Sequence, residues 1–500
     1  MPRQTFAKIE LRIMGNGRRP KALFEERLEE FEALFHPTSI AVVGVSSDER
    51  KVGSAWVKGL LSANFKGNVY AVGAGGGTIA GSEIFTSLRS IPGEIDYVVV
   101  CIPRRSVLSL LDDCAFKKVK FIQFFTAGFS ETGDAEGHEL ERDVAAKARQ
   151  SGIRIIGPNC IGVYCPESRF PSGPAQEPRI GIDGPVGFIS QSGGLADKLV
   201  ELGIARGIGF SKGVSFGNGA DLDAADFLQY LAADPKTRII GAYFEGSRDG
   251  RRLFDSMKKI AQVKPLVAWK GGKTGVGAEA AMSHTGSLSS SAAIWSTMLK
   301  QAGAIEVGSL EELVDVLLLF QQVRAWQGIG VAIVGGLCGG GGGISVSAGD
   351  ACSEEGLNIP ALSETTRQEL VNILGPVGSI VRNPVDISQA YGQPSILHKV
   401  MEVIMADANI QLVIVQEDAD ILTKYGCLQI SDIINGILID FASRCSKPVV
   451  VVSPPGSAEM DRLRIENQLS QASIPVFPTM ERAARAIARV NQYFSSHQGT

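Results

Sequence analysis

One histidine of the chain stands in a loop of small residues. His284 lies in the segment Ser283-His284-Thr285-Gly286-Ser287, soon after the glycine-rich run 270–275. A core histidine usually has bulky apolar neighbours, whereas a histidine among Ser, Thr and Gly is exposed and free to move, which suits covalent catalysis. A solvated histidine beside a turn is the simpler interpretation of this segment alone, so the choice depends on the rest of the chain.

Glu245 is a second candidate, because it follows an apolar run that predicts a strand. The carboxyl ends of strands carry function in open α/β sheets. A carboxylate placed there can hold a histidine ring in one tautomer and orient it. The alternative is an ordinary exposed acid at the end of a strand.

Two glycine-rich turns follow predicted strands and precede predicted helices, at 190–194 and 339–343. Glycines let the backbone approach a phosphate group closely, and a helix N-terminus favours anions. Neither turn is a Walker A loop, because no Gly-Lys-Ser/Thr follows. Strand-to-helix turns of the kind that every α/β fold needs remain the alternative for each.

A further turn, at 44–53, follows the first predicted strand. It lacks the pattern GxGxxG, so it does not indicate a dinucleotide site. The phosphates of a nucleotide-bearing cofactor can still lie near Ser46, Ser47 and Lys51. Lys51 is equally compatible with a solvated surface lysine.

Apolar runs alternate with helical patterns along the chain, which predicts an α/β fold with parallel sheets. A Pro/Gly/Ser-rich stretch at 166–185 predicts a linker before a second unit, and 325–328 forms the junction to a third. Strands are predicted at 39–46, 69–72, 97–102, 121–125, 153–156, 186–190, 239–244, 266–269, 331–334, 412–416 and 449–453, and helices at 23–35 and 310–322.

The second and third units look like distant repeats of one design. Each begins with an apolar strand, a glycine-rich turn and a helix, and each later has an Asn-x-x-Asp element, at 218–221 and 383–386. Two such units packed face to face would direct two helix N-termini at one point. The backbone N–H groups and the helix dipoles would make that point an anion site.

Composition excludes several classes of protein. The 500 residues carry a net charge of −4, so no single-sign field attracts nucleic acid. The eight cysteines form no CxxC pair, which indicates reduced thiols in a cytoplasmic protein and neither a disulfide framework nor a metal site. The chain contains no run of 18 apolar residues, so no membrane span is predicted. Acidic residues begin at Glu10, which disfavours a transit peptide.

The motifs together resemble a known family, over about residues 30–490. The chain is similar to the α subunit of NDP-forming acyl-CoA synthetases, of the ADP-forming acetate–CoA ligase type, which are related to succinyl-CoA synthetase. The resemblance rests on five motifs in the family's order: His-Pro-Thr-Ser-Ile-Ala-Val-Val-Gly at 36–44, Gly-Pro-Asn-Cys-Ile-Gly at 157–162, Ser-Gln-Ser-Gly at 190–193, Ser-His-Thr-Gly at 283–286 and Asn-Pro-Val-Asp at 383–386.

The resemblance implies a role for each candidate residue. His284 would be the transiently phosphorylated histidine, and Glu245 would stabilise the phosphohistidine. Coenzyme A would be bound by Gly44, Ser46, Ser47, Lys51, Gly53, Asn159 and Cys160, with Cys160 near the thiol end of coenzyme A and without a catalytic role. The phosphate would be bound by Ser190, Gln191, Ser192, Gly193, Gly194, Gly340, Gly341 and Gly342, which would form the paired helix N-termini. The histidine loop would carry the phosphoryl group from acyl phosphate to ADP.

The resemblance also implies an organisation and a partner. After an N-terminal extension at 1–35, a Rossmann-like CoA-binding domain at 36–175 would precede two flavodoxin-like, succinyl-CoA synthetase-like domains at 181–325 and 329–492. The three units use the whole chain, so ADP or ATP with Mg²⁺ would be bound mainly by a separate ATP-grasp β subunit, in an α2β2 assembly. A small carboxylic acid and its acyl-CoA would be the substrates.

Two positions depart from the family pattern. The segment 73–77 reads Gly-Ala-Gly-Gly-Gly where the family has Asn-Pro and a basic residue, and Gly-Gly-Leu-Cys at 335–338 replaces Thr-Asn-Gly-Gly. The first departure motivates an alternative, an inactive regulatory protein that binds CoA or acyl-CoA. His284 and Glu245 argue against it, because a sensor needs neither. A Rossmann dehydrogenase is disfavoured, because GxGxxG is absent.

Overall fold

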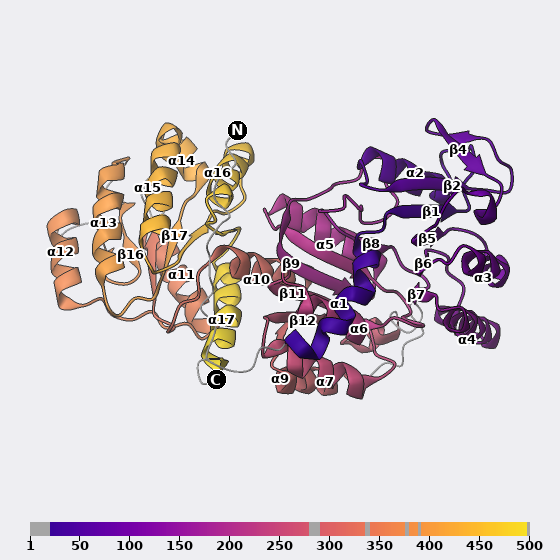
Figure 1. Ribbon diagram of the computed structural model, residues 1–500. Coiled ribbons are helices and arrows are strands. Elements are labelled where there is room, and N and C mark those ends of the chain that lie inside the picture. Colours follow the sequence, from indigo (N-terminus) through magenta and orange to yellow (C-terminus); the bar gives the residue numbers. More distant parts are fainter. Residues whose placement is uncertain (1–20, 280–290, 336–340, 376–379, 389–391, 498–500) are drawn as a thin grey trace. The chain divides into compact units, whose positions relative to one another are not determined.

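The computed structural model of the chain describes residues 21–279, 291–335, 341–375, 380–388 and 392–497. Its residues form two compact units, one of Arg18–Leu317 and one that contains Leu318–Thr500. The first unit holds two sheets and the second unit holds one (Figure 1). All three sheets are mainly parallel and have helices around them, which confirms the predicted α/β class.

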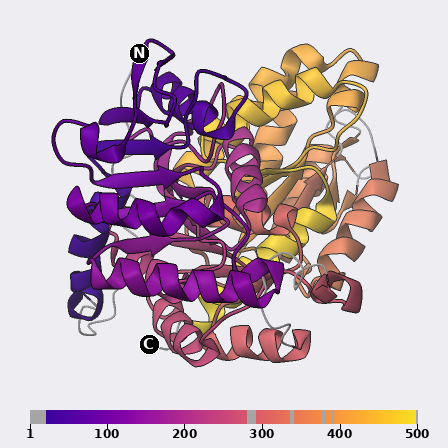
Figure 2. The ribbon, with the colours of Figure 1, turned by 90° about the vertical axis from the view of Figure 1, so that its right-hand side faces the viewer.

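The first sheet has the strand order β3-β4-β2-β1-β5-β6-β7. Alternate residues of its buried strands face opposite sides, so that α2 packs on one face and α3 and α4 pack on the other (Figures 1 and 2). The elements are β1 (Ser39–Val43), α2 (Val52–Ser62), β2 (Asn68–Val72), β3 (Thr78–Ile79), β4 (Ser82–Phe85), β5 (Tyr97–Val100), α3 (Val107–Phe116), β6 (Phe121–Phe124), α4 (Ala135–Gln150) and β7 (Arg154–Ile156).

The second sheet has the order β13-β12-β11-β9-β10-β8, and its edge strand β8 is antiparallel to β10. The predicted linker 166–185 is too long, because β9 already begins at Asp183. The elements are β8 (Gly162–Tyr164), β9 (Asp183–Ser190), α5 (Gly193–Ala205), β10 (Phe210–Ser215), α6 (Ala224–Ala233), β11 (Ile239–Phe244), α7 (Gly250–Ala261), β12 (Leu266–Lys270), α9 (Ala292–Ala302), β13 (Ile305–Val307) and α10 (Leu310–Gln322).

The third sheet, β15-β16-β14-β17-β18-β19, repeats the order of the second sheet, with the antiparallel strand again at the edge. This match confirms the predicted repeat. The elements are β14 (Val331–Gly335), α11 (Gly341–Glu354), α12 (Glu364–Leu374), β15 (Ile380–Val381), β16 (Val385–Asp386), α13 (Pro394–Ala406), β17 (Leu412–Gln416), α14 (Ala419–Lys424), α15 (Ser431–Arg444), β18 (Val449–Val452), α16 (Glu459–Gln471), β19 (Val476–Phe477) and α17 (Met480–Ser496).

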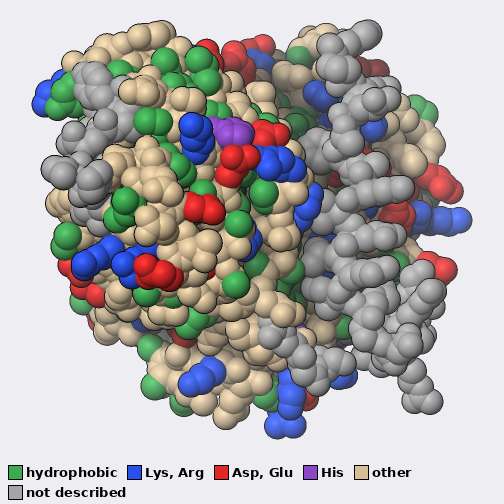
Figure 3. Space-filling model, turned by 90° about the vertical axis from the view of Figure 1, so that its left-hand side faces the viewer, with side chains coloured by type: hydrophobic (Ala, Val, Ile, Leu, Met, Phe, Trp, Pro, Cys, Tyr) green, Lys and Arg blue, Asp and Glu red, His purple; other side chains and the backbone are tan. Residues whose placement is uncertain are grey.

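Basic and acidic side chains are interleaved on the surface of this C-terminal unit that Figure 3 shows. Ion pairs are also present within helices of this unit. In α15, for example, the Arg444 guanidinium lies 2.7 Å from the Asp440 carboxylate. The described charges on this face are therefore of both signs.

The helix predicted at 23–35 exists as α1 (Lys21–Phe35), and its last two turns are part of the core of the first unit. Phe31 and Phe35 are fully buried. Both rings stack on Tyr230 of α6, with centroid distances of 5.3 and 4.8 Å, and Phe31 also contacts Phe227 edge-on. The extension thus supplies a wall of the core that the second sheet otherwise lacks.

Phe31→Ala is expected to destabilise the first unit by about 3–5 kcal/mol, because it leaves a cavity among aromatic rings. Thermal unfolding of the purified chain measures the effect. The matched control is Phe116→Ala, at a side chain that is 62% exposed and contacts Arg89, for which we expect a change of about 1 kcal/mol or less. Equal effects of the two substitutions would contradict a structural role for α1.

Candidate functional site

The turn between β9 and α5 presents a helix N-terminus at the carboxyl edge of the second sheet. The Ser190 hydroxyl donates to the Ser192 carbonyl at 2.7 Å, and the Ser192 hydroxyl caps the helix by accepting the Leu195 N–H at 3.4 Å. Gly193 and Gly194 begin the helix, and a side chain added at Gly194 would meet open space. The first N–H groups of a helix have no intrahelical acceptor, so this turn suits an anion.

Gln191 connects this turn to Glu245. Its side-chain oxygen accepts the backbone N–H groups of Glu245 and Gly246 at 2.7 and 3.0 Å. The backbone N–H of Gln191 donates to the Tyr243 carbonyl at 3.1 Å. The position of the Glu245 backbone relative to the α5 N-terminus is therefore fixed. The structure brings the two predicted features, the glycine turn and the strand-end acid, to one edge.

The Glu245 side chain is buried and has two polar neighbours that the sequence analysis missed. The Tyr243 hydroxyl donates to Glu245 Oε1 at 3.2 Å, and burial, reinforced by the Glu245 charge, raises the Tyr243 pKa. Lys270 ends β12 in register with Phe244 and is only 2% exposed. Burial lowers the Lys270 pKa and the Glu245 charge opposes that shift. A lysine directly after the apolar run Leu266–Trp269 was the available signal.

The loop that contains Asn159 and Cys160 reaches this turn from the first sheet. The Asn218 N–H donates to the Pro158 carbonyl at 3.0 Å, and a side chain at Gly193 would lie 3.0 Å from Ile161. The Cys160 thiol is buried, and burial raises its pKa far above the ordinary range. A buried, protonated thiol is a poor nucleophile, which agrees with the expectation of no catalytic role.

The turn 44–53 lies at the carboxyl edge of the first sheet, before α2. Gly44 has a φ of +106°, and a side chain there would meet the Cys101 carbonyl oxygen at 2.4 Å. A side chain at Gly53 would lie 2.5 Å from the Gly44 carbonyl oxygen. The Ser46 hydroxyl accepts the Asp48 N–H at 3.3 Å, and Lys51 is exposed at the helix N-terminus. The backbone of this turn is thus closely packed, with Lys51 as an exposed cation beside it.

Four predicted site residues lie either outside the described residues or in the C-terminal unit. His284 and Gly340 lie outside the described residues. Gly341 and Gly342 form the first turn of α11, which belongs to the C-terminal unit.

No helix among the described residues has both the length and the apolar content needed to cross a lipid bilayer.

Comparison with known proteins agrees with these features. Residues 38–166 match the family described as CoA binding domain, and residues 183–320 match the succinyl-CoA ligase like flavodoxin domain. The fold resembles the structure of the dinucleotide forming acetyl-coenzyme A synthetase 1 of Ca. Korarchaeum cryptofilum in complex with phosphate and ADP, at 30% identity, a TM-score of 0.81 and coverage of 93% of this chain and 97% of that one.

Two curated relatives are subunits of ligases from Pyrococcus furiosus. The α subunit of acetate–CoA ligase [ADP-forming] II is 37% identical, over 76% of this chain and 80% of the relative. The α subunit of acetate–CoA ligase [ADP-forming] I is 32% identical, over 92% of this chain and 97% of the relative. With its CoA-binding domain, its capped helix at the second sheet and these near full-length matches, the chain belongs to the family of ADP-forming acetate–CoA ligase α subunits.

Proposed function

We propose that the chain interconverts acyl-CoA, ADP and phosphate with a free acid, CoA and ATP, through transient phosphorylation of His284. The proposal is carried by Glu245, whose backbone Gln191 fixes relative to the N-terminus of α5 and whose carboxylate accepts the Tyr243 hydroxyl. Such a carboxylate can accept the N–H of an imidazole and leave the other ring nitrogen free for a phosphoryl group. The nearby helix N-terminus offers dipoles for that group's charge.

In this proposal the phosphoryl group passes from an acyl phosphate to His284 and then to ADP. Phosphate displaces CoA from acyl-CoA and gives an acyl phosphate, with CoA as the leaving thiol. The free nitrogen of His284 then takes the phosphoryl group and releases the acid, and ADP finally accepts it as ATP. Ser190, Gln191, Ser192, Gly193 and Gly194 would bind the phosphoryl group on one side. Gly340, Gly341 and Gly342 at α11 would supply the second helix N-terminus.

Coenzyme A would be held by the turn 44–53, with its thiol end toward Asn159 and Cys160. The α2 N-terminus and the exposed Lys51 suit its phosphates. Within the unusual segment 73–77, Gly73 lies against this turn, because a side chain there would lie 1.9 Å from the Val45 carbonyl oxygen. This close approach accounts for the glycine at 73.

Gly73→Ala is expected to weaken CoA binding about tenfold or more, because the added methyl group displaces Val45 and the turn that follows. Calorimetric titration with CoA measures the effect. Gly75→Ala is the matched control, since a side chain at Gly75 meets nothing within 4 Å and should leave the affinity unchanged. Equal affinities of the two variants would exclude this turn from the CoA site.

A separate ATP-grasp β subunit would bind ADP or ATP with Mg²⁺, in an α2β2 assembly in the cytoplasm. The retention of His284 and Glu245 speaks against the alternative of an inactive CoA-binding regulator. Because both curated relatives are named for acetate, acetate is the first acid to test.

The proposed function is tested by mixing the purified chain with an ATP-grasp β subunit that is active with the α subunit of a relative. Acetate, CoA and ATP are added, and acyl-CoA is measured, followed by a panel of other small acids. We expect acyl-CoA to form only when both subunits are present. No acyl-CoA with any acid, from a β subunit whose own complex is active, would contradict the proposal.

A further inference from the structure

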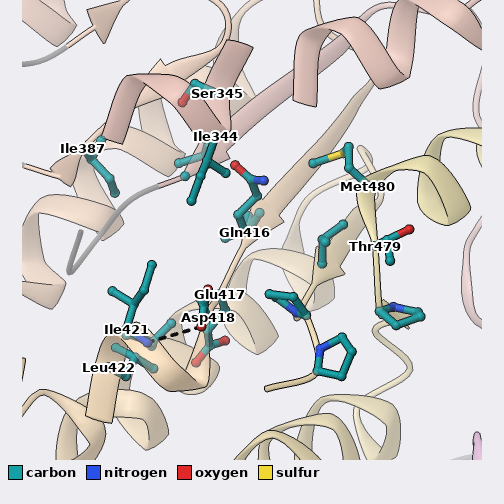
Figure 4. Close-up of a pocket in the computed structure, with 18 of the residues that line it drawn as sticks. Ile344, Ser345, Ile387, Gln416, Glu417, Asp418, Ile421, Leu422, Thr479 and Met480 are labelled. Carbon is teal, nitrogen blue, oxygen red and sulfur yellow. Dashed lines mark hydrogen bonds between the residues drawn. The ribbon is translucent and has the colours of Figure 1, made fainter. Parts of the chain in front are cut away.

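A cavity of about 270 Å³ opens at the carboxyl edge of the third sheet. Figure 4 shows its residues converging from α11, β17, α14 and the start of α17. It lies at the carboxyl ends of the neighbouring strands β14 and β17, from which the chain continues in opposite directions along the sheet. Open α/β sheets bind ligands at such positions. Most of its wall is apolar, with side chains that include Ile344, Ile387, Ile421, Leu422, Pro454 and Met480.

Glu417 is a buried acidic residue in this wall. Its side chain is 5% exposed, and neither carboxyl oxygen has a hydrogen-bond partner among the described residues. Its backbone N–H donates to the Val452 carbonyl at 2.9 Å, which fixes the residue at the end of β17. A buried carboxyl group without a partner is costly, and such groups in folded proteins normally have one. The Glu417 carboxyl group therefore lacks the hydrogen-bond donor that a buried carboxyl group normally has.

The neighbouring charges do not pair with Glu417. The Arg464 guanidinium donates to Asp432 and to the Ser431 hydroxyl, and the Asp418 carboxylate accepts the N–H groups of Asp420 and Ile421 as the cap of α14. Burial raises the Glu417 pKa to about 8; Arg464 opposes this shift and Asp432 adds to it. At pH 7 the carboxyl group is largely protonated unless a cation lies beside it.

The charge of the cavity selects the sign of a ligand. Its described lining contains the carboxyl groups of Glu417, Asp418 and Glu481, and no lysine, arginine or histidine. Among the described side chains an anion would meet only carboxyl groups, whereas a cation would meet an unpaired acceptor. The N-termini of α14 and α17 at the cavity are already capped by the side chains of Asp418 and Thr479. Glu417 also occupies the place in the third sheet that Glu245 has in the second, directly after the strand next to the central one.

We propose that this cavity is a binding site for a small organic ammonium compound, whose charged group pairs with Glu417 and whose apolar body contacts the aliphatic wall. The proposal does not rest on the ligase reaction: among the described residues, none that is assigned to that reaction lines the cavity, while α11 supplies Ile344 and Ser345 to its wall. The ammonium supplies the donor that Glu417 lacks, and the carboxyl group ionises on binding and passes its proton to the buffer.

The test titrates the full chain with butylamine, benzylamine and phenethylamine, and with benzyl alcohol and benzoate as neutral and anionic counterparts. We expect an amine to bind with a Kd below about 10 mM and at least about tenfold more tightly than its counterparts. At pH 7 the binding enthalpy should depend on the ionisation enthalpy of the buffer, which reports the released proton. At pH 9 this dependence should be much smaller for butylamine, which is still protonated there, because Glu417 is then mostly ionised.

Glu417→Gln should weaken amine binding about tenfold to a hundredfold and abolish the buffer dependence. Glu369→Gln, at an exposed position on α12, is the matched control and should change neither. Ile344→Trp, at a half-exposed position of the cavity wall, should block binding by filling the space and covers the case in which Glu417→Gln fails to fold. No binding of any amine, equal binding of benzoate, or undiminished binding by folded Glu417→Gln would each overturn the proposal.

Discussion

His284→Ala is expected to lose acid-dependent acyl-CoA formation completely. The imidazole nitrogen is the only acceptor for the phosphoryl group in the proposed mechanism, and alanine offers none. The fold should survive, because substitutions in a segment rich in Ser, Thr and Gly usually cost little stability. Acyl-CoA formation in the presence of the β subunit, together with the thermal midpoint, measures both expectations.

His138→Ala is the matched control for the loss of an imidazole. His138 is exposed on α4, and its removal should leave the rate unchanged. Residual synthetase activity in His284→Ala would rule out a phosphohistidine at this position. Loss of activity in both variants would show that the defect is not specific to His284.

Glu245→Gln is expected to lower the yield of phosphoenzyme about tenfold or more while CoA binding remains. The amide is isosteric and keeps the clamp by Gln191, which is made to the Glu245 backbone. It removes the negative charge that would stabilise the imidazole N–H, and a hydrogen bond to a charged group contributes about 1.5–3 kcal/mol. The phosphoenzyme yield at saturating acyl-CoA is the measurement, with calorimetric CoA titration beside it.

The control for this charge is Glu139→Gln, at an exposed position on α4. We expect it to retain the full yield of phosphoenzyme. An unchanged yield in Glu245→Gln would remove Glu245 from the mechanism. A parallel loss of CoA binding would instead indicate a structural defect, because the predicted CoA residues lie on the turn 44–53 and at 159–160.

The long apolar strands of the fold could be predicted from the sequence. The boundaries of β11, β17 and α10 agree with the predicted ranges 239–244, 412–416 and 310–322. These segments are continuous apolar runs or strongly periodic, so the local signal is sufficient. The short strands β3, β4, β15 and β16 have two to four residues each and were not predicted, since so few residues show no period. The predicted domain boundaries stay a prediction.

Contacts between distant segments could not be predicted. Gln191 reaches Glu245 across 54 residues, and α1 packs on Tyr230 almost two hundred residues away. The two Asn-x-x-Asp elements illustrate this limit, because the asparagine side chains of the two elements make different hydrogen bonds. Asn218 donates to Glu131 at 2.6 Å and to Glu141 at 2.9 Å, and so links segments of the first and second sheets.

Asn383, in contrast, works within the third sheet. Its amide donates to the Val331 carbonyl at 2.7 Å and accepts the Ile333 N–H at 3.1 Å. The shared motif therefore reflects the common strand order of the second and third sheets. The role of each asparagine depends on the residues that the fold places beside it.

The central claim is most directly tested by phosphoenzyme formation in the purified chain alone. The chain is incubated with radiolabelled phosphate and a small panel of acyl-CoA compounds, beginning with acetyl-CoA, and the protein-bound label is tested for stability in acid and base. We predict an acid-labile, base-stable label that depends on acyl-CoA and is absent from His284→Ala. A label that persists in His284→Ala, or no label from any acyl-CoA by a chain that binds CoA, would contradict a phosphohistidine mechanism.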